Sequence, residues 1–363
     1  MELLFWLGTG VVFYVYLGYP AVLALIRIAA TRPVRKVYQE PSVSIVIAAY
    51  NERDRIERKI RNCLSLDYPK RQLQIVVSLD GSSDGSAFIV RKFVSRGVVL
   101  VRSTNHRGKA HALNQAMRRA TGDIVVFADV RQTLDPAAIR ELVANFADDR
   151  VGAVSGELVL MGHSDREANS EVGLYWRYEK MLRSMESDIH SVPGATGAIY
   201  AIRRGLYEEL PEETLIDDVL IPMRIVLKGK RAVFDSSAKA YDMVACCPEA
   251  EFGRKVRTLA GNYQLLSQLP GVLVPFRNPV FFQFLSHKLG RLVVPYALIV
   301  ILASNLFLWG GIYSVTLVLQ GAWYSLAAFG YILSKRGIEV TGTSQAPEAA
   351  GAPILAGQNR KAA

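Results

Sequence analysis

The sequence predicts an α/β domain with a mainly parallel sheet, joined to transmembrane helices. Short apolar runs rich in β-branched residues occupy 44–49, 74–79 and 123–128, and helical patterns lie between them. Such runs are typical of strands that are buried on both faces. Because strands alternate with helices, a parallel sheet is expected. Two long uncharged stretches, one before and one after this region, predict the membrane helices.

Regular apolar stripes indicate the helices between the strands. Ile56, Ile60 and Leu64 recur every four residues after the first run, and a similar stripe spans residues 110–117. This spacing places apolar side chains on one helix face, which can then cover the sheet.

Composition narrows the function classes. The 363 residues include 43 basic and 33 acidic side chains, which give a net charge of +10, and half of the residues are hydrophobic. A positive balance suits contact with anionic lipid and with phosphates. We expect no nucleic-acid role, because the basic residues flank membrane segments and no recognition helix or aromatic RNA platform is visible. The three cysteines form neither a disulfide framework nor a zinc motif.

The uncharged stretches predict three membrane spans. Residues 1–30 are expected to form one transmembrane helix, because residues 3–26 carry no charge and a span needs about 20 apolar residues. A cleaved signal peptide is disfavoured, since no basic segment precedes the run. Residues 292–334 are about twice as long as one span and contain Gly310 and Gly311 near the middle, which predicts a helical hairpin.

Basic side chains next to these stretches predict their orientation. They follow the first span, precede the hairpin and follow the hairpin, and they are Arg27, Arg32, Arg35, Lys36, Lys288, Arg291, Lys335 and Arg336. Because basic residues concentrate on the cytoplasmic side, we expect a multi-pass protein of the inner (plasma) membrane with residues 40–270 as a cytoplasmic domain.

Two further segments have distinct compositions. Residues 275–290 mix phenylalanine and leucine with His287 and Lys288. This predicts an amphipathic helix in the headgroup plane, with a buried core helix as the alternative. Residues 337–363 are rich in Ala, Gly and Pro without periodicity and are expected to be disordered.

Polar residues follow each predicted strand, at 50–52, 80–85 and 129–131. Ligands of open parallel sheets bind at the carboxyl ends of the strands. Each segment alone also fits a turn or a helix cap, so the argument rests on three acidic strand ends in one unit. Residues 105–109 (NHRGK) place two cations before a helix, which suits a diphosphate, with a solvated basic turn as the alternative. No G-x-G-x-x-G opens the first helix, and no P-loop motif occurs.

The order of these motifs carries a resemblance. The motifs are AYNE at 49–52, DGSSD at 80–84, RGKAHALN at 107–114, FAD at 127–129, DD at 217–218 and RKVR at 254–257. In this order they resemble the family 2 glycosyltransferases, and most of all the membrane-integrated branch of cellulose, hyaluronan and poly-N-acetylglucosamine synthases. The resemblance covers about residues 40–335. It implies a GT-A fold, which has a Rossmann-like, mainly parallel sheet.

The resemblance implies a site for a nucleotide-sugar donor. The residues that it assigns are Ala49, Tyr50 and Glu52 near the base and ribose, Asp80 on the nucleobase, and Arg107, Lys109 and Arg257 on the phosphates. Arg254, which precedes Arg257 in the same motif, is also expected in the substrate site. Asp129 matches the first aspartate of the family's D-x-D motif, which holds a divalent cation, Mg²⁺ or Mn²⁺, on the diphosphate.

The resemblance also implies a site for the acceptor. Asp218 matches the family's general base, which takes a proton from the acceptor hydroxyl so that direct displacement inverts the anomeric carbon. Its neighbour Asp217 would orient it, and the alternative is that both aspartates only cap a helix. Gly194, Thr196 and Gly197 fall where the family binds the acceptor or the donor sugar, with a plain loop as the alternative.

Three departures from the family pattern limit this inheritance. Arg131 replaces the second aspartate of D-x-D, so that the metal would be bound differently or partly replaced by the guanidinium. Arg254 and Thr258 replace the glutamine and tryptophan of the Q-x-x-R-W motif, and the loss of a stacking platform argues against processive synthesis. Three spans are too few to enclose a polysaccharide channel, unless the chain forms a homo-oligomer or has an export partner.

The expected function is therefore inverting transfer of a sugar from a UDP- or GDP-sugar to a membrane-associated polysaccharide or lipid-linked acceptor. A polyprenyl-phosphate sugar synthase, which would use the same donor site with a lipid phosphate as acceptor, stays open. A catalytically inactive membrane scaffold also stays open, because Arg131 replaces the second aspartate of D-x-D.

Overall fold

The computed structural model describes residues 1–161, 171–243 and 248–335. The chain divides into two compact units: Trp6–Ile301, which contains the sheet, and Met1–Phe5 together with Leu302–Ala363. The disordered tail that is predicted at 337–363 lies outside the described residues.

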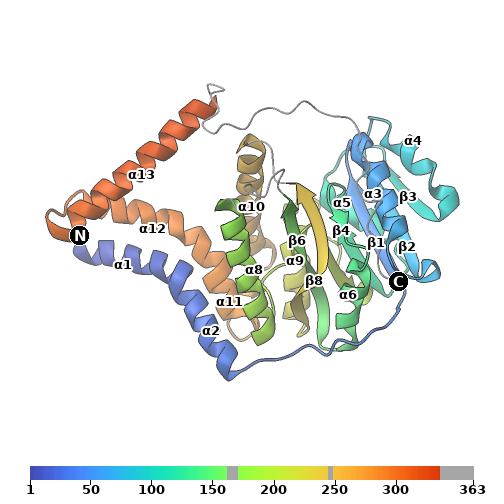
Figure 1. The fold of residues 1–363 in the computed structure, drawn as a ribbon, viewed down its shortest axis with the longest axis horizontal. Coiled ribbons are helices and arrows are strands. Elements are labelled where there is room, and N and C mark those ends of the chain that lie inside the picture. The colour runs from blue at the N-terminus through green and yellow to red at the C-terminus, as the bar shows by residue number, and fades with distance from the viewer. Residues whose placement is uncertain (162–170, 244–247, 336–363) are drawn as a thin grey trace, which may run out of the picture. The chain divides into compact units, whose positions relative to one another are not determined.

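An eight-stranded sheet with the order β3-β2-β1-β4-β7-β6-β8-β5 forms the centre of the larger unit (Figure 1). The strands are β1 (Val43–Ala49), β2 (Leu73–Asp80), β3 (Val98–Ser103), β4 (Ile124–Ala128), β5 (Thr133–Leu134), β6 (Val151–Met161), β7 (Ile199–Arg203) and β8 (Arg231–Met243). β1 pairs in parallel with β2 and β4, β2 with β3, and β6 with β8. β7 is antiparallel to β4 and β6, and β5 is antiparallel to β8. The predicted mainly parallel sheet is confirmed.

Helices cover both faces of the sheet (Figure 1). They are α3 (Arg53–Ser65), α4 (Ser86–Arg91), α5 (Lys109–Met117), α6 (Ala138–Ala144), α8 (Glu171–Ile189), α9 (Asp217–Leu227) and α10 (Pro248–Gln268). Helices α3, α4 and α6 contribute to one buried apolar cluster, whereas α5, α9 and α10 contribute to the other.

The alternation of side chains along β1 explains the two clusters. Ile45 and Ile47 point into the cluster that contains Ile56 of α3, and Val46 points into the cluster that contains Leu113 of α5. All five side chains are at most 2% exposed. Burial of one such side chain stabilises the fold by about 1.5–3 kcal/mol. The sheet is therefore fixed from both faces, and its carboxyl edge becomes a rigid platform.

Three helical segments among the described residues are long and apolar enough to cross a membrane: Glu2–Ala29, Phe281–Asn305 and Gly311–Leu333. Their helices are α1 (Glu2–Phe13), η1 (Tyr14–Gly18) and α2 (Tyr19–Ala29), then α11 (Phe281–Gln283), η7 (Phe284–Leu289) and α12 (Gly290–Asn305), then α13 (Gly311–Lys335). Gly310 and Gly311 have φ angles of 91° and 53° before α13. A tight turn in the left-handed region favours glycine, as the predicted hairpin requires.

The segment 275–290 is only partly helical. Turns occupy its first residues, and the helix begins at Phe281 and continues into α12. Phe284 and His287 are buried, while Phe282 and Leu285 are exposed. One face therefore packs against the protein, and contact of the other face with lipid headgroups stays a prediction.

Polar contacts connect the apolar segments of the larger unit to α8. Tyr19 donates a hydrogen bond of 2.5 Å to Glu186 Oε1, and His287 Nδ1 lies 2.7 Å from the same oxygen. Arg291 donates to Glu179 Oε2 at 2.8 Å. These contacts hold α2, η7 and α12 against one helix, so that η7 has a defined position beside the sheet domain.

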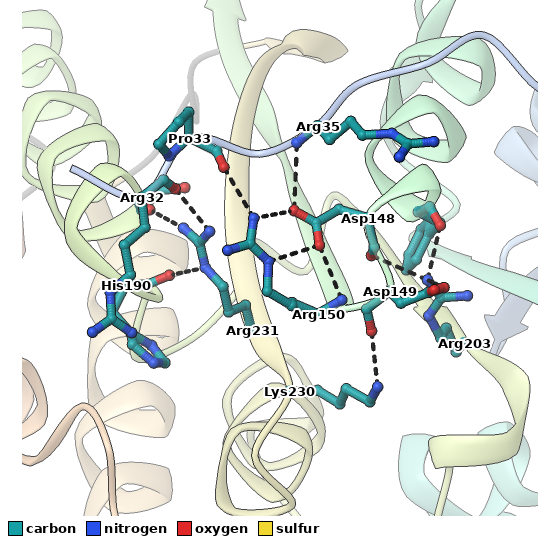
Figure 2. A network of polar contacts seen from close by, with 12 residues as sticks. Arg32, Pro33, Arg35, Asp148, Asp149, Arg150, His190, Arg203, Lys230 and Arg231 are labelled. Carbon is teal, nitrogen blue, oxygen red and sulfur yellow. Dashed lines mark hydrogen bonds and ion pairs between the residues drawn. The ribbon is translucent and has the colours of Figure 1, made fainter.

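The linker between α2 and β1 is held by buried Arg231, which is 4% exposed (Figure 2). Its guanidinium donates hydrogen bonds of 2.7 Å to the carbonyl oxygens of Arg32, Ser187 and His190. A planar guanidinium can reach three acceptors at fixed angles, which an ammonium on a flexible stem cannot reproduce. Arg231 therefore ties the linker to the end of α8.

A second arginine holds the same linker at Asp148 (Figure 2). Arg150 donates to Asp148 Oδ2 at 2.7 Å and to the carbonyl oxygen of Pro33 at 3.3 Å, and the amide of Arg35 donates to Asp148 Oδ2 at 3.4 Å. Hydrogen bonds from Arg150 hold the pKa of Asp148 well below its usual range, although burial opposes this. Asp148 therefore stays ionised at neutral pH.

We predict that Arg231→Lys lowers the free energy of unfolding by about 2–4 kcal/mol, because at least two buried carbonyl groups lose their donor. Urea unfolding of the detergent-solubilised chain measures the change. Arg204→Lys at an exposed position is the matched control and should change stability by less than about 0.5 kcal/mol. Equal stability of both variants would contradict the role given to Arg231.

Candidate active site

One lysine joins the carboxylates that the sequence predicts for the site. Lys109, the first residue of α5, places Nζ 2.9 Å from Asp129 Oδ1 and 3.1 Å from Asp217 Oδ1. Burial opposes the charge of Lys109, but Asp129, Asp217 and Asp218 outweigh burial and raise its pKa. Residues far apart in the chain thus meet at the carboxyl edge of the sheet, where ligands of such sheets bind.

Asp80 is linked to this group through the turn before α5. Its Oδ2 accepts hydrogen bonds from the backbone amides of Arg107 at 3.0 Å and Gly108 at 2.6 Å. Gly108 has a φ angle of 102°, which favours glycine. Asp80 is 2% exposed, and its Oδ1 has no hydrogen-bond partner among the described residues. An acceptor atom is therefore left over for a ligand.

The adjacent carboxylates at the start of α9 have different surroundings. Asp217 is buried and accepts a hydrogen bond of 3.0 Å from Tyr200 at Oδ2, in addition to its lysine contact. The carboxylate of Asp218 has no hydrogen bond to any described residue, and its backbone oxygen accepts one of 2.7 Å from Ala195. The N-cap of α9 is Ile216, without a side-chain bond. Capping therefore does not explain either aspartate.

The surroundings of Asp218 change its proton affinity. Burial raises the pKa of Asp218 to about 6 and Asp217 adds to the rise, while Lys109 and Lys288 oppose it. A carboxylate with this pKa is ionised at neutral pH and is more basic than an exposed one, as suits proton transfer in a transition state. Asp218 has the properties of a general base.

The loop at 194–197 lies against both carboxylates. A β-carbon added at Gly197 would lie 3.3 Å from Asp218 Oδ2 and 3.6 Å from Asp129 Oδ2. The two oxygen atoms therefore border the same small space. A glycine at this position keeps that space open.

The other two residues predicted in this loop are Thr196 and Gly194, and they also have defined neighbours. The amide of Thr196 donates to Ser155 Oγ at 3.0 Å, and Thr196 is buried. A β-carbon added at Gly194 would lie 3.4 Å from Lys288 Nζ. The plain-loop alternative is disfavoured, because all three residues lie on the side of the site that contains Asp218.

The residues predicted for the base and ribose follow β1. Ala49 is its last residue and is buried, and the ring of Tyr50, which is 46% exposed, stacks on His106 with 3.8 Å between centroids. His106 Nδ1 lies 2.8 Å from Asp80 Oδ2. Glu52 pairs with an arginine of α3 at 3.2 Å. Tyr50 and Asp80 are therefore neighbours, whereas the carboxylate of Glu52 is turned to α3.

Arg107 is engaged by a residue that the sequence analysis missed. Its Nε lies 3.1 Å from Glu212 Oε2, and its Nη2 contacts Glu212 Oε1. Both side chains are about half exposed. Because exposed ion pairs contribute only about 0–1 kcal/mol, a diphosphate can displace Glu212 from Arg107 at little cost.

Arg131 is engaged by Asp242 of β8. Its Nε donates to Asp242 Oδ2 at 2.9 Å, and Gln132 donates to the same buried oxygen at 2.8 Å. Replacement of a metal ligand by this guanidinium is therefore not supported, since Arg131 neutralises a different carboxylate. Among the described residues, no group of three or more His, Cys, Asp or Glu side chains is placed to hold a metal ion.

Helix α10 lies beside the segment that leads to α9. A β-carbon at Gly261 would lie 2.6 Å from Ile216 Cγ2, and Gln264 accepts a hydrogen bond of 3.0 Å from the amide of Leu215. Arg257 is exposed about one turn before Gly261, and Arg254 is partly buried one turn further. Contact of these two arginines with a diphosphate stays a prediction.

Comparison with known sequences agrees with this geometry. The family model described as "Glycosyl transferase family 2" matches residues 44–211. A poly-β-1,6-N-acetyl-D-glucosamine synthase of Staphylococcus aureus is 24% identical over 240 residues, which cover 65% of this chain and 58% of that protein. Residues 44–211 of this chain are thus similar to glycosyltransferase family 2.

Other known proteins are also similar to this chain. The probable glycosyltransferase YdaM of Bacillus subtilis is 27% identical over 235 residues, which cover 61% of this chain and 55% of that protein. The matched region thus spans little more than half the length of these curated relatives. The mannosyltransferase PcManGT from Pyrobaculum calidifontis, solved with GDP-Man and Mn²⁺, has a TM-score of 0.71 at 24% identity and covers 92% of this chain and 94% of its own. That likeness shows a shared GT-A fold.

Four further residues, which the sequence motifs did not indicate, contact residues predicted for the site. They are Tyr200, which binds Asp217, Glu212, which binds Arg107, Asp242, which binds Arg131, and Lys288, which lies against Gly194. Tyr200 could have been noticed as a hydroxyl within an otherwise apolar strand. Lys288 was interpreted only as a charge next to a membrane span.

We predict that turnover depends on the protonation of Asp218. Because protonated Asp218 cannot accept a proton, kcat/KM should fall about tenfold per pH unit below pH 6 and stay level above it. Nucleotide-sugar turnover measured from pH 4.5 to 8 tests this. A profile that is level between pH 5 and 7 would contradict the assignment.

We predict that Gly197→Ala lowers turnover about 100-fold or more while the chain stays folded. The added methyl group would lie 3.3 Å from Asp218 Oδ2, where it fills the space that a reacting hydroxyl needs. The control is Gly205→Ala, whose added β-carbon meets no atom within 4 Å. Equal loss of activity in both variants would remove the steric argument.

Proposed function

We propose that this family 2 glycosyltransferase is an inverting enzyme that moves a sugar from a nucleotide diphosphate to a membrane-associated acceptor. The observation that carries the proposal is Asp218, a carboxylate with a raised pKa and no hydrogen bond to a described residue, beside Asp129 and Gly197. An inactive scaffold would not need this arrangement, because an unpaired and partly buried carboxylate destabilises a fold.

Residues at the ends of β1 and β2 suit the nucleoside of the donor. Asp80 Oδ1 is a buried acceptor without a hydrogen-bond partner in the described part of the chain, so a nucleobase N–H can donate to it. The ring of Tyr50 offers a half-exposed face for stacking beside it. Arg107 and Lys109 follow at the N-terminus of α5, where two cations and backbone amides favour a diphosphate.

The site also fits a divalent cation that is bound together with the donor. Mg²⁺ is commonly held by one or two carboxylates plus substrate phosphates, so Asp129 with Oδ2 beside Gly197 can supply the protein ligand. When bound, the cation would act as a Lewis acid that eases departure of the nucleoside diphosphate. PcManGT, which shares the fold, was solved with GDP-Man and Mn²⁺.

The two aspartates of α9 have different roles in the proposed reaction. Asp218 takes the proton of the acceptor hydroxyl as that oxygen attacks the anomeric carbon from the side opposite to the leaving diphosphate, so the configuration inverts. Asp217 stays fixed between Tyr200 and Lys109 and keeps the start of α9 in place. Arg257 and Arg254 of α10 would add positive charge near the leaving group.

We further propose that residues 40–270 lie in the cytoplasm and that Glu2–Ala29, Phe281–Asn305 and Gly311–Leu333 cross the inner membrane. Basic residues next to these helices support this orientation. The side chains of Arg32 and Arg35 are exposed on the linker, where anionic headgroups can bind them. The acceptor would then reach Asp218 from the bilayer, as a lipid-linked sugar or a polysaccharide end.

We predict that the purified chain turns over a UDP- or GDP-sugar and that Asp218→Asn reduces this turnover at least 1,000-fold while nucleotide binding changes less than threefold. The reason is that asparagine keeps the shape but cannot accept the proton. Radiolabelled donors with and without Mg²⁺ or Mn²⁺ provide the measurement, and Asp149→Asn at a fully exposed position is the control. Turnover by Asp218→Asn equal to that of the parent would overturn the base assignment.

A further inference from the structure

A second cation lies beside the general base, and it comes from a membrane segment. Lys288 belongs to η7, near the start of the apolar segment Phe281–Asn305. Its Nζ would lie 3.4 Å from a β-carbon built on Gly194, and Val219 Cγ2 would lie 3.1 Å from the same point. Gly194 precedes Ala195, whose amide binds the backbone oxygen of Asp218. Lys288 is therefore against the loop that borders the base.

Among the residues that the structure describes, no carboxylate contacts Lys288 directly. Glu179 is the acidic side chain of α8 that attracts it, but both oxygens of Glu179 are already occupied. Oε1 lies 3.3 Å from Arg183 Nε and 3.3 Å from His287 Nε2, and Oε2 lies 2.8 Å from Arg291. Among the described residues Lys288 makes no ion pair or hydrogen bond. A partly buried ammonium without a partner costs free energy that a bound anion would offset.

Lys288 lies on a different segment of the chain from Lys109, the lysine proposed for the donor phosphates. Lys109 binds Asp129 and Asp217, whereas Lys288 lies against Gly194. Both lysines act on the charge of Asp218, one from the sheet domain and the other from an apolar segment that is long enough to cross a membrane. A group bound by Lys288 would be on the side from which a membrane-borne acceptor arrives.

We propose that Lys288 binds a phosphate group of the acceptor, next to the hydroxyl that Asp218 deprotonates. This inference rests on the proposed function, and it narrows the acceptor to a lipid-linked sugar that carries a phosphate. Lysine near the start of a membrane segment is at the depth of lipid headgroups, where the phosphate of such a lipid lies. The apolar part of Phe281–Asn305 would accompany the lipid chain.

Binding of farnesyl phosphate and of farnesol to the full-length chain in neutral detergent tests the proposal without knowledge of the sugar. The parent should bind farnesyl phosphate at least tenfold more tightly than farnesol. Lys288→Met should weaken the binding of farnesyl phosphate at least tenfold. The affinities for farnesol and for UDP or GDP should change less than twofold. Lys288→Arg should keep most of the affinity for farnesyl phosphate. Arg277→Met, which removes an exposed cation just before the same helix, is the matched control and should behave like the parent.

Several results would overturn the proposal. Equal binding of farnesyl phosphate and farnesol by the parent would do so without any variant. Inorganic phosphate that competes as strongly as farnesyl phosphate would assign the site to a free anion, and a parallel loss of nucleotide binding would move Lys288 to the donor side.

Lys288 could also act only through the charge of Asp218. A pH profile of donor turnover that shifts in Lys288→Met, with unchanged farnesyl phosphate binding, would show such a positioning role and would overturn the proposal. Donor turnover by the parent distinguishes failure of the proposed function from failure of this inference. A parent that turns over no nucleotide sugar removes the proposed function, whereas a parent that turns over donor but does not prefer farnesyl phosphate removes only this inference.

Discussion

The ammonium group of Lys109 is the constraint on which the site depends. Three carboxylates, Asp129, Asp217 and Asp218, lie at one edge of the sheet, and their mutual repulsion would push the strand end and α9 apart. Lys109 Nζ lies 2.9 Å from Asp129 and 3.1 Å from Asp217, at the end of a turn that Asp80 fixes. Water screens the contact with buried Asp217 less than the partly exposed pair with Asp129. Three chain segments are thereby held in one geometry before any ligand binds.

The same arrangement gives two neighbouring aspartates different chemistry. Asp217 lies 3.1 Å from Lys109 Nζ and accepts a hydrogen bond from the hydroxyl of Tyr200. Asp218 is one residue later on the helix and has neither contact, so burial and the charge of Asp217 raise its pKa to about 6. A carboxylate with a pKa near neutrality is suited to proton transfer. The free member of the pair is therefore the one that can move a proton.

The fold and the carboxylates of the site could be predicted from sequence because their signals are local. Strands such as Val43–Ala49 are short β-branched runs, and the rule that ligands bind at strand ends then selects Asp80 and Asp129. Contacts across the chain leave no such signal. Arg107 and Glu212 are 105 positions apart, and the sequence around either residue does not indicate that the two side chains pair. The pairing of Arg131 with Asp242 was missed for the same reason.

The position of Lys288 is fixed by different contacts from those that fix Asp80 and Asp129. These two aspartates lie at strand ends of the sheet, whose two apolar cores hold the strands in place. Lys288 sits on η7, and η7 is fixed by His287, whose ring is held by Glu186 and Glu179 of α8. Glu186 also binds Tyr19 of the first apolar segment. Polar contacts of the apolar segments in the larger unit thus decide where Lys288 lies relative to Asp218.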